Sequence, residues 1–202
     1  VTIQLEELIG NIKVSHTLIC RLYGNGEIDV DASFTTNEDF NLPPSLIAGS
    51  ILSFVGVVGG YGRGSIENYQ DRKNAAYIGK YQSTVNDMKE KYVRSQSMGE
   101  RCDTRWLTLT DKEGKGIKIS SADTFDFSAL HYTDKELFDI KYGHDLADIY
   151  RAEVMLNLDC IQRGLGNASC GPGLVLSMRY RKTLFIDMLS ACLLLLSNVS
   201  SI

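Results

Sequence analysis

Hydrophobic and polar residues alternate along the first part of the chain, which predicts β-strands. Residues 12–22 place apolar side chains at every second position, with lysine, serine, threonine and arginine between most of them. Residues 27–34 alternate in the same way after the turn Gly24-Asn25-Gly26, and Asn-Gly is typical of a tight hairpin connection. We therefore predict that these two segments pair as a β-hairpin.

The same pattern returns in the middle of the chain. The segments "RWLTLT" (105–110) and "GIKISS" (116–121) flank the turn-rich "DKEGKG", which predicts a second hairpin. A short helix is predicted after Thr133, because Thr133 and Glu136 have the spacing of a capping box. Residues 150–160 alternate again and predict another strand.

Many short strands, frequent glycine and asparagine turns, and one or two short helices favour an all-β fold, an antiparallel sandwich. The chain of 202 residues is long enough for one domain with a sizeable core.

Composition narrows the possible partners. The net charge of −4 offers no basic surface for nucleic acid. The most apolar run, residues 188–196, is far shorter than the ~20 residues that a membrane span requires, so we predict a buried strand or helix there. The five cysteines are scattered without a C-x-x-C pair, and we expect reduced thiols in a cytoplasmic protein. The chain starts at Val1 without a signal-peptide pattern, and we expect it to be a piece of a longer protein.

The glycine-rich stretch "GGYGRGS" (59–65) raises the question of a phosphate site. It lacks the G-x-x-x-x-G-K-[ST] spacing of a P-loop, and no helix pattern follows it as a dinucleotide fingerprint requires. We therefore interpret it as a junction between a strand and a loop in which glycine permits tight backbone geometry.

A dense polar set follows this stretch. Two arginines matched by carboxylates describe either an active-site cluster or a network that anchors a loop to the fold, and we favour the structural interpretation. The predicted network consists of Arg63, Glu67, Asn68, Asp71 and Arg72.

Other candidate chemistry is weaker. His16 lies on the apolar face of a predicted strand, and the three histidines show no spacing suited to a metal site. Cys170 lies in a loop with four glycines and a proline, where no neighbouring base is evident. We expect a turn there, with ligand contact by the loop as an open alternative.

Four stretches in order resemble one family. They are "YGRGSIENYQDRK" (61–73), "RSQSMGERCDTRWLTL" (94–109), "FDFSALHYTDKEL" (125–137) and "LNLDCIQRGLGNASCGP" (156–172). Together they resemble the C-terminal domain of bacterial β-galactosidases of glycoside hydrolase family two, over roughly residues 12–172. We therefore divide the chain into this domain, residues 1–172, and an atypical tail, residues 173–202.

The resemblance implies an antiparallel β-supersandwich, similar to galactose mutarotase-like domains, packed beside a (β/α)₈ barrel. In such enzymes the barrel holds both catalytic carboxylates, and a barrel takes about 250 residues. This chain has no room for one, so we expect it to have no catalytic residues and to be inactive alone.

The resemblance also implies the partners. We expect a loop at the rim of a galactoside site, with polar or backbone contacts from Asn167, Ser169 and Cys170. The expected partners are the remaining β-galactosidase domains, the sugar and other copies of the chain, without nucleic acid or a membrane. No cofactor or metal is expected in this chain, with Mg or Na held by other domains of the full enzyme.

Two other functions stay open at this point. A free-standing mutarotase-like enzyme would need a histidine and a carboxylate converging on one sheet face, and the nominees are His131 or His144 with Asp145 or Glu153. A carbohydrate-binding module without catalysis is the other.

Overall fold

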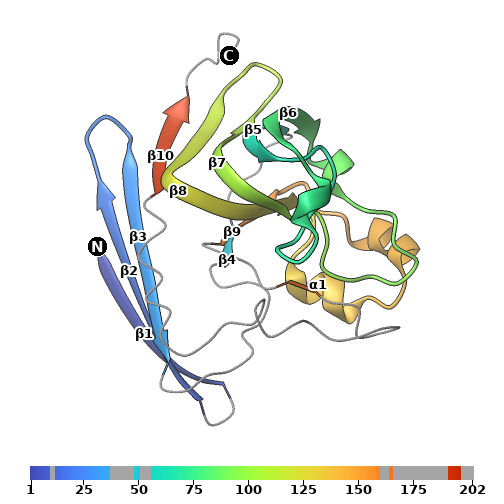
Figure 1. Cartoon of the computed structure of the whole chain (residues 1–202), viewed down its shortest axis with the longest axis horizontal. Helices are drawn as coiled ribbons and strands as arrows, with labels where there is room; N and C mark the ends of the chain where they lie inside the picture. The colour runs from blue at the N-terminus through green and yellow to red at the C-terminus, as the bar shows by residue number, and fades with distance from the viewer. Residues whose placement is uncertain (10–11, 37–47, 51–55, 160–163, 166–190, 197–202) are drawn as a thin grey trace.

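The chain forms a curved antiparallel sheet with little helix. A computed structural model describes residues 1–9, 12–36, 48–50, 56–159, 164–165 and 191–196 (Figure 1). Its strands are β1 (Thr2–Ile9), β2 (Ile12–Leu22), β3 (Ile28–Thr36), β4 (Ala48–Ser50), β5 (Val57–Arg63), β6 (Ile78–Thr84), β7 (Arg101–Thr110), β8 (Gly116–Leu130), β9 (Met155–Asp159) and β10 (Ala191–Leu196). The helices are α1 (Asp134–Asp139) and the short 3₁₀ turns η1 (Lys73–Ala75), η2 (Asn86–Met88) and η3 (Gly143–Ile149).

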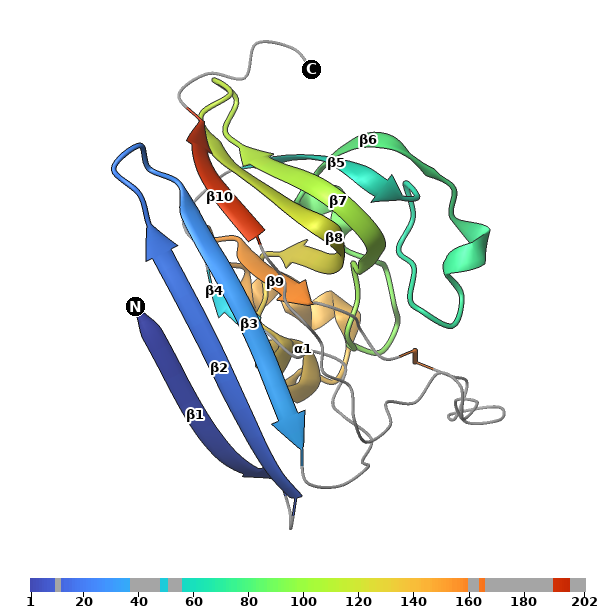
Figure 2. The same cartoon turned by 60° about the vertical axis from the view of Figure 1, so that its left-hand side comes forward.

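The strands pair in the order β1-β2-β3-β10-β8-β7-β5-β6, and β9 and β4 branch from β8. Along one edge of β8, the first half pairs with β10 and the second half pairs with β9. Along the other edge, β8 pairs with β7. The register between β7 and β8 shifts on both sides of Thr104, and such irregularities bend a sheet. The part with β1–β3 is joined to the part with β5–β8 through β10, and the two parts lie in different layers (Figure 2). The all-β antiparallel sandwich is confirmed.

Both predicted hairpins are confirmed. In the first, Leu22 pairs with Ile28 across a turn in which Gly26 has φ 88°. A hydrogen bond from Gly26 N to the Tyr23 carbonyl, 3.1 Å, closes this turn. Val14 and Leu22 lie on the apolar face of β2, which the sequence predicts to be buried. Val14 is buried, but Leu22 at the end of the strand is 68% exposed.

The second hairpin and the helix also follow the prediction. Thr110 of β7 pairs with Gly116 of β8, and the Asp111 side chain accepts hydrogen bonds from the turn backbone. At α1, Thr133 accepts from Glu136 N and Glu136 accepts from Thr133 N, which makes a complete capping box. These features form locally, because their partners lie within a few residues of each other.

The hydrophobic core lies between the β7–β8 layer and the helical segment that follows it. Leu107, Ile119 and Leu156 are fully buried on three strands, and Leu137 of α1 and Leu146 of η3 cover them from the other side. Burial of this apolar area is the main force that holds the domain together.

The last described strand comes from the predicted tail. Residues 191–196 form β10, and the β10 backbone pairs with both β3 and β8. The apolar run therefore contains a strand, while the boundary at residue 172 stays a prediction. No helix among the described residues has the length and apolar character needed to cross a bilayer.

Gly116 of the second hairpin lies so close to β7 that a larger residue there should destabilise the fold. A Cβ at Gly116 would lie 1.9 Å from the Leu109 carbonyl oxygen, so Gly116→Ala must displace backbone. We expect the free energy of unfolding to fall by about 2–3 kcal/mol, measured by urea titration. Gly24→Ala is the control, because nothing lies within 4 Å of its Cβ position. A loss of the same size in both variants would contradict this account of Gly116.

Candidate functional site

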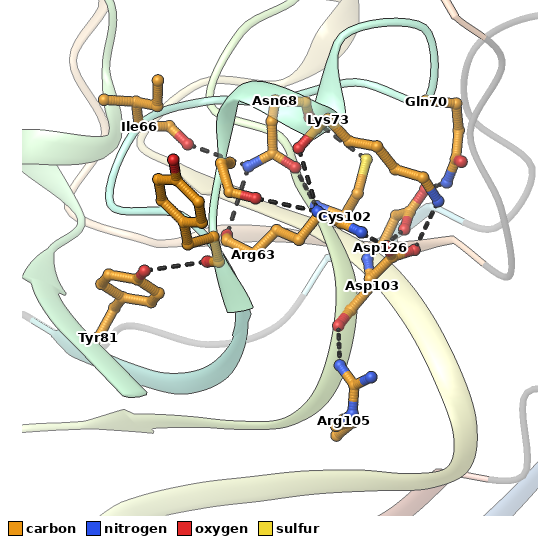
Figure 3. A network of polar contacts seen from close by, with 12 residues as sticks. Arg63, Ile66, Asn68, Gln70, Lys73, Tyr81, Cys102, Asp103, Arg105 and Asp126 are labelled. Atoms are coloured by element: carbon orange, nitrogen blue, oxygen red, sulfur yellow. Dashed lines mark hydrogen bonds and ion pairs between the residues drawn. The ribbon is translucent and has the colours of Figure 1, made fainter. Parts of the chain in front are cut away.

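The loop between β5 and β6 is the most polar part of the described chain, and it folds back onto the start of β7 (Figure 3). Asn68 lies at its centre. The Asn68 side chain donates to the carbonyl oxygens of Arg63 and Ile66, at 3.3 and 3.0 Å, and accepts from Cys102 N at 3.0 Å. The Asn68 backbone N–H donates to the Glu100 carbonyl at 2.9 Å. One amide thus satisfies backbone groups on both the loop and β7.

Arg63 and Lys73 hold the two ends of the loop through Asp103. The Arg63 Nε and the Lys73 Nζ each bind one carboxylate oxygen of Asp103, and Arg63 also donates to the Ala76 carbonyl at 2.9 Å. Asp103 has φ 52°, the only positive φ outside glycine in the described chain, and its N–H donates to Asp126 at 3.0 Å. Burial raises the pKa of Asp103, but the two cations outweigh this effect and hold it below its usual range.

Glu67 is a second centre in the same loop. Its carboxylate pairs with Arg72 and accepts from the Tyr92 hydroxyl, and it also accepts from Gly99 N at 3.0 Å. The Glu67 side chain is 7% exposed and the Arg72 side chain 51%. Several charge-assisted hydrogen bonds to one buried carboxylate fix the loop in place.

Three carboxyl groups lie buried beneath this loop. Glu100, Asp126 and Asp159 are 1–2% exposed, and Asp126 pairs with Asp159 across β8 and β9. Asp126 accepts from Gln70 Nε2 at 2.8 Å, whereas Glu100 Oε1 is buried without a hydrogen-bond partner among the described residues. Burial, together with the charges of Asp159 and Asp126, raises the pKa of Glu100 well above its usual value.

Neighbouring groups show no activated nucleophile. Burial raises the pKa of the Cys102 thiol, and its Sγ lies 3.4 Å from the Asn68 carbonyl. A thiol in such surroundings is inert, because the reactive form is the thiolate. In the described part of the chain, no group of three or more histidine, cysteine or acidic side chains has metal-site geometry.

Neither histidine predicted for mutarotase chemistry meets its carboxylate on a sheet face in the described part of the chain. His131 is buried, its Nδ1 lies 3.1 Å from the Glu153 carbonyl rather than its carboxylate, and its ring stacks near Tyr150. His144 is 78% exposed on the surface and pairs with the adjacent Asp145. His16 is half-buried on β2.

The five residues of the predicted network lie in or directly beside the β5–β6 loop, but they do not pair only with one another. Arg72 binds Glu67, as its position suggests, but Arg63 binds Asp103, which sequence reasoning missed. Asp71 accepts from Leu165 N at 3.3 Å. The signal that could have found Asp103 is the run of polar residues at the start of β7, "ERCDTR". The predicted rim residues Asn167, Ser169 and Cys170 lie outside the described residues.

Comparison with known proteins identifies the family. The sequence pattern of the family described as β-galactosidase small chain matches residues 1–185. The chain belongs to the β-galactosidase small-chain family.

Individual β-galactosidases agree with this assignment. The domain is 30% identical over 138 residues to the enzyme of Priestia megaterium, which covers 68% of this chain and 13% of that enzyme. It is 33% identical over 114 residues to that of Staphylococcus xylosus, covering 56% and 11%, and 29% identical over 149 residues to that of Vibrio cholerae, covering 72% and 14%. This β-galactosidase domain thus spans between 11% and 14% of the length of these relatives.

The two ends of the Glu67–Arg72 pair should contribute unequally to the stability of this small-chain domain. Glu67→Ala leaves Gly99 N–H and the Tyr92 hydroxyl without their acceptor, and we expect the free energy of unfolding to fall by about 2–4 kcal/mol. Arg72→Ala removes a half-exposed partner and should cost about 1 kcal/mol or less. Chemical denaturation of both variants measures the difference in free energy of unfolding. Equal losses would show that Glu67 is no more important to the loop than Arg72.

Glu100 makes the stability of this small-chain domain fall as pH rises. Its folded pKa is raised, so the folded state holds a proton that the unfolded state releases above about pH 4.5. The penalty grows from that pH upward until the folded pKa is reached. We expect Glu100→Gln to raise the free energy of unfolding at pH 7 by about 1–2 kcal/mol and to make its pH dependence above about pH 4.5 less negative. Equilibrium unfolding across this range measures both, and an unchanged slope would contradict the assignment.

Proposed function

We propose that this chain is a non-catalytic sandwich domain of a β-galactosidase that hydrolyses terminal β-galactosides such as lactose. The observation that carries the proposal is the family match over residues 1–185 in a chain that spans only 11–14% of its relatives. The remaining length of such enzymes leaves ample room for a (β/α)₈ barrel of about 250 residues.

The carboxyl groups of the described chain support the non-catalytic role. Retaining hydrolysis needs two carboxyls about 5 Å apart that both face the sugar. Glu100, Asp126 and Asp159 lie close in the fold but are 1–2% exposed beneath the β5–β6 loop, where a sugar cannot reach them. Asp126 suits a structural role, because it accepts hydrogen bonds from Asp103 N and from Gln70 Nε2.

An exposed apolar surface supports packing against another domain. Val93 and Phe138 are 85% and 87% exposed, and Tyr142 is 41% exposed. Val93 and Tyr142 lie together, because Gly143 N donates to the Val93 carbonyl at 2.9 Å and Arg94 bridges to Tyr142. Exposed apolar side chains that gather in this way are typical of interfaces. We propose the catalytic part of the same enzyme as the partner, with further copies of the enzyme as additional contacts.

Other parts of the proposal rest on the family resemblance. Asn167, Ser169 and Cys170 are proposed to contact the sugar at the rim of the active site. A cytoplasmic location, and Mg or Na on other domains of the enzyme, are proposed on the same ground.

The test of this function uses the chain alone and in a chimera. The purified chain should release no o-nitrophenol from o-nitrophenyl β-galactoside, because the proposal places the catalytic carboxyls in the remaining part of the enzyme. The Priestia megaterium enzyme with its matching 138-residue segment replaced by this chain should keep activity above that of the same enzyme without the segment. Hydrolysis or mutarotation of sugar by the chain alone would overturn the proposal, and so would a chimera no more active than the deletion.

A further inference from the structure

A cavity of about 230 Å³ lies between the β5–β6 hairpin and the start of β7. Gly60 and Gly62 of β5 form part of its wall. A Cβ at Gly62 would lie 2.7 Å from Thr104 Oγ1, and one at Gly60 would lie 3.3 Å from the Trp106 carbonyl oxygen. Glycine inside a strand often marks a place where a ligand or another backbone approaches closely. Glycine at these two positions therefore lets Thr104 and Trp106 of β7 lie close against the β5 backbone beside the cavity.

Arg101 brings an unpaired positive charge to this cavity. Its guanidinium donates to the carbonyl oxygens of Glu100 and Ser65, at 3.0 and 3.1 Å. It forms no ion pair within the described part of the chain, although it is only 7% exposed. Burial lowers the pKa of Arg101, and this effect outweighs the opposing influence of the Glu90, Glu67 and Glu100 carboxylates. Arg63, at the same cavity, differs because Asp103 neutralises it.

Thr104 adds a second unsatisfied group to the cavity wall. It is 1% exposed, and its Oγ1 has no hydrogen-bond partner among the described residues. A buried hydroxyl without a partner is costly, and a hydroxyl donates readily to a carboxylate. A buried cation and a free hydroxyl donor at one cavity suit an anionic oxygen ligand.

Another part of the wall is apolar and limits the class of anion. The polar part also includes Gln82 and Asp87, and the Asp87 carboxylate accepts from the Thr84 hydroxyl at 2.7 Å. Val58, Met88 and Phe127 line the cavity together with the two glycines. An inorganic oxyanion would satisfy the cation but would leave these apolar surfaces uncovered. A ligand with an apolar body and one carboxylate satisfies both, since guanidinium and carboxylate form paired hydrogen bonds.

We propose that this cavity binds a small carboxylate with an apolar body, about the size of phenylacetate. The carboxylate lies on Arg101 and Thr104, and the apolar body lies against Val58, Met88 and Phe127. This proposal does not depend on the proposed function.

The first test compares ligands on the unmodified full chain. Isothermal titration with sodium phenylacetate should give a dissociation constant on the order of 1 mM, as suits a ligand of this size. At ten times this concentration the melting temperature should rise by about 4 °C. Phenylacetamide has the same shape without the charge and should bind at least tenfold more weakly, and sodium sulfate of equal ionic strength should give no comparable shift. Equal binding of phenylacetate and phenylacetamide, or no binding of phenylacetate up to about 20 mM, overturns the proposal.

The second test compares matched variants. Arg101→Gln should weaken phenylacetate binding at least tenfold. Arg105→Gln removes the same charge from the same strand, but Arg105 donates to the Asp103 carbonyl at 2.8 Å and is not part of the cavity wall, so its affinity should stay within twofold. Equal losses in the two variants would mean that phenylacetate responds only to overall charge, which contradicts the site.

A third variant keeps Arg101 intact. Ser83 of β6 lines the cavity and is half-buried, so Ser83→Phe fills the space without touching the guanidinium and should abolish binding. It decides the question if Arg101→Gln does not fold. Undiminished binding to a folded Ser83→Phe protein would place the ligand elsewhere and overturn the proposal.

Discussion

The attachment of the β5–β6 loop to β7 is the interaction on which the rest of the described structure depends. Asn68 satisfies backbone groups on both sides, and Asp103 binds Arg63 and Lys73 at the two ends of the loop. Asp103 can do so because the register shift in β7 and its positive φ turn its carboxylate towards the loop. A single irregularity in one strand thus holds a long polar segment against the sheet.

Charge compensation separates the buried ionic groups of this region into two kinds. Asp103 and Glu67 accept from cations and backbone donors, so their burial is offset by charge-assisted hydrogen bonds. Glu100 lies among other carboxyls and holds its proton more tightly, while Arg101 has only neutral acceptors. The first kind stabilises the fold, and the second kind contributes pH dependence and a candidate ligand site.

The proposed role in a β-galactosidase agrees with this division. A domain that supports an active site on another part of the enzyme needs a rigid loop and a surface for packing, and the anchored β5–β6 loop and the exposed Val93, Phe138 and Tyr142 supply them. The cavity beside Arg101 lies under the β5–β6 hairpin, and Arg63 and Ser65 at the start of the anchored loop are part of its wall. A ligand bound there would stabilise the folded domain.

Local patterns were sufficient to predict the parts of the fold whose partners are close in sequence. The alternation of β2 and β3, the Asn-Gly turn and the Thr133–Glu136 capping box all depend on residues a few positions apart. The polar character of residues 63–72 was also visible, because two arginines and two acids there need partners.

Only the tertiary structure decided which groups meet. Sequence reasoning could not pair Arg63 with Asp103, since the two lie 40 residues apart, and it could not place β10 between β3 and β8. It also gave no sign that Arg101 would be buried beside a cavity, with backbone carbonyls as its hydrogen-bond acceptors. Alternation and turn chemistry specify a strand and its hairpin neighbour, whereas long-range pairs and cavities depend on how distant strands stack, which no local pattern encodes.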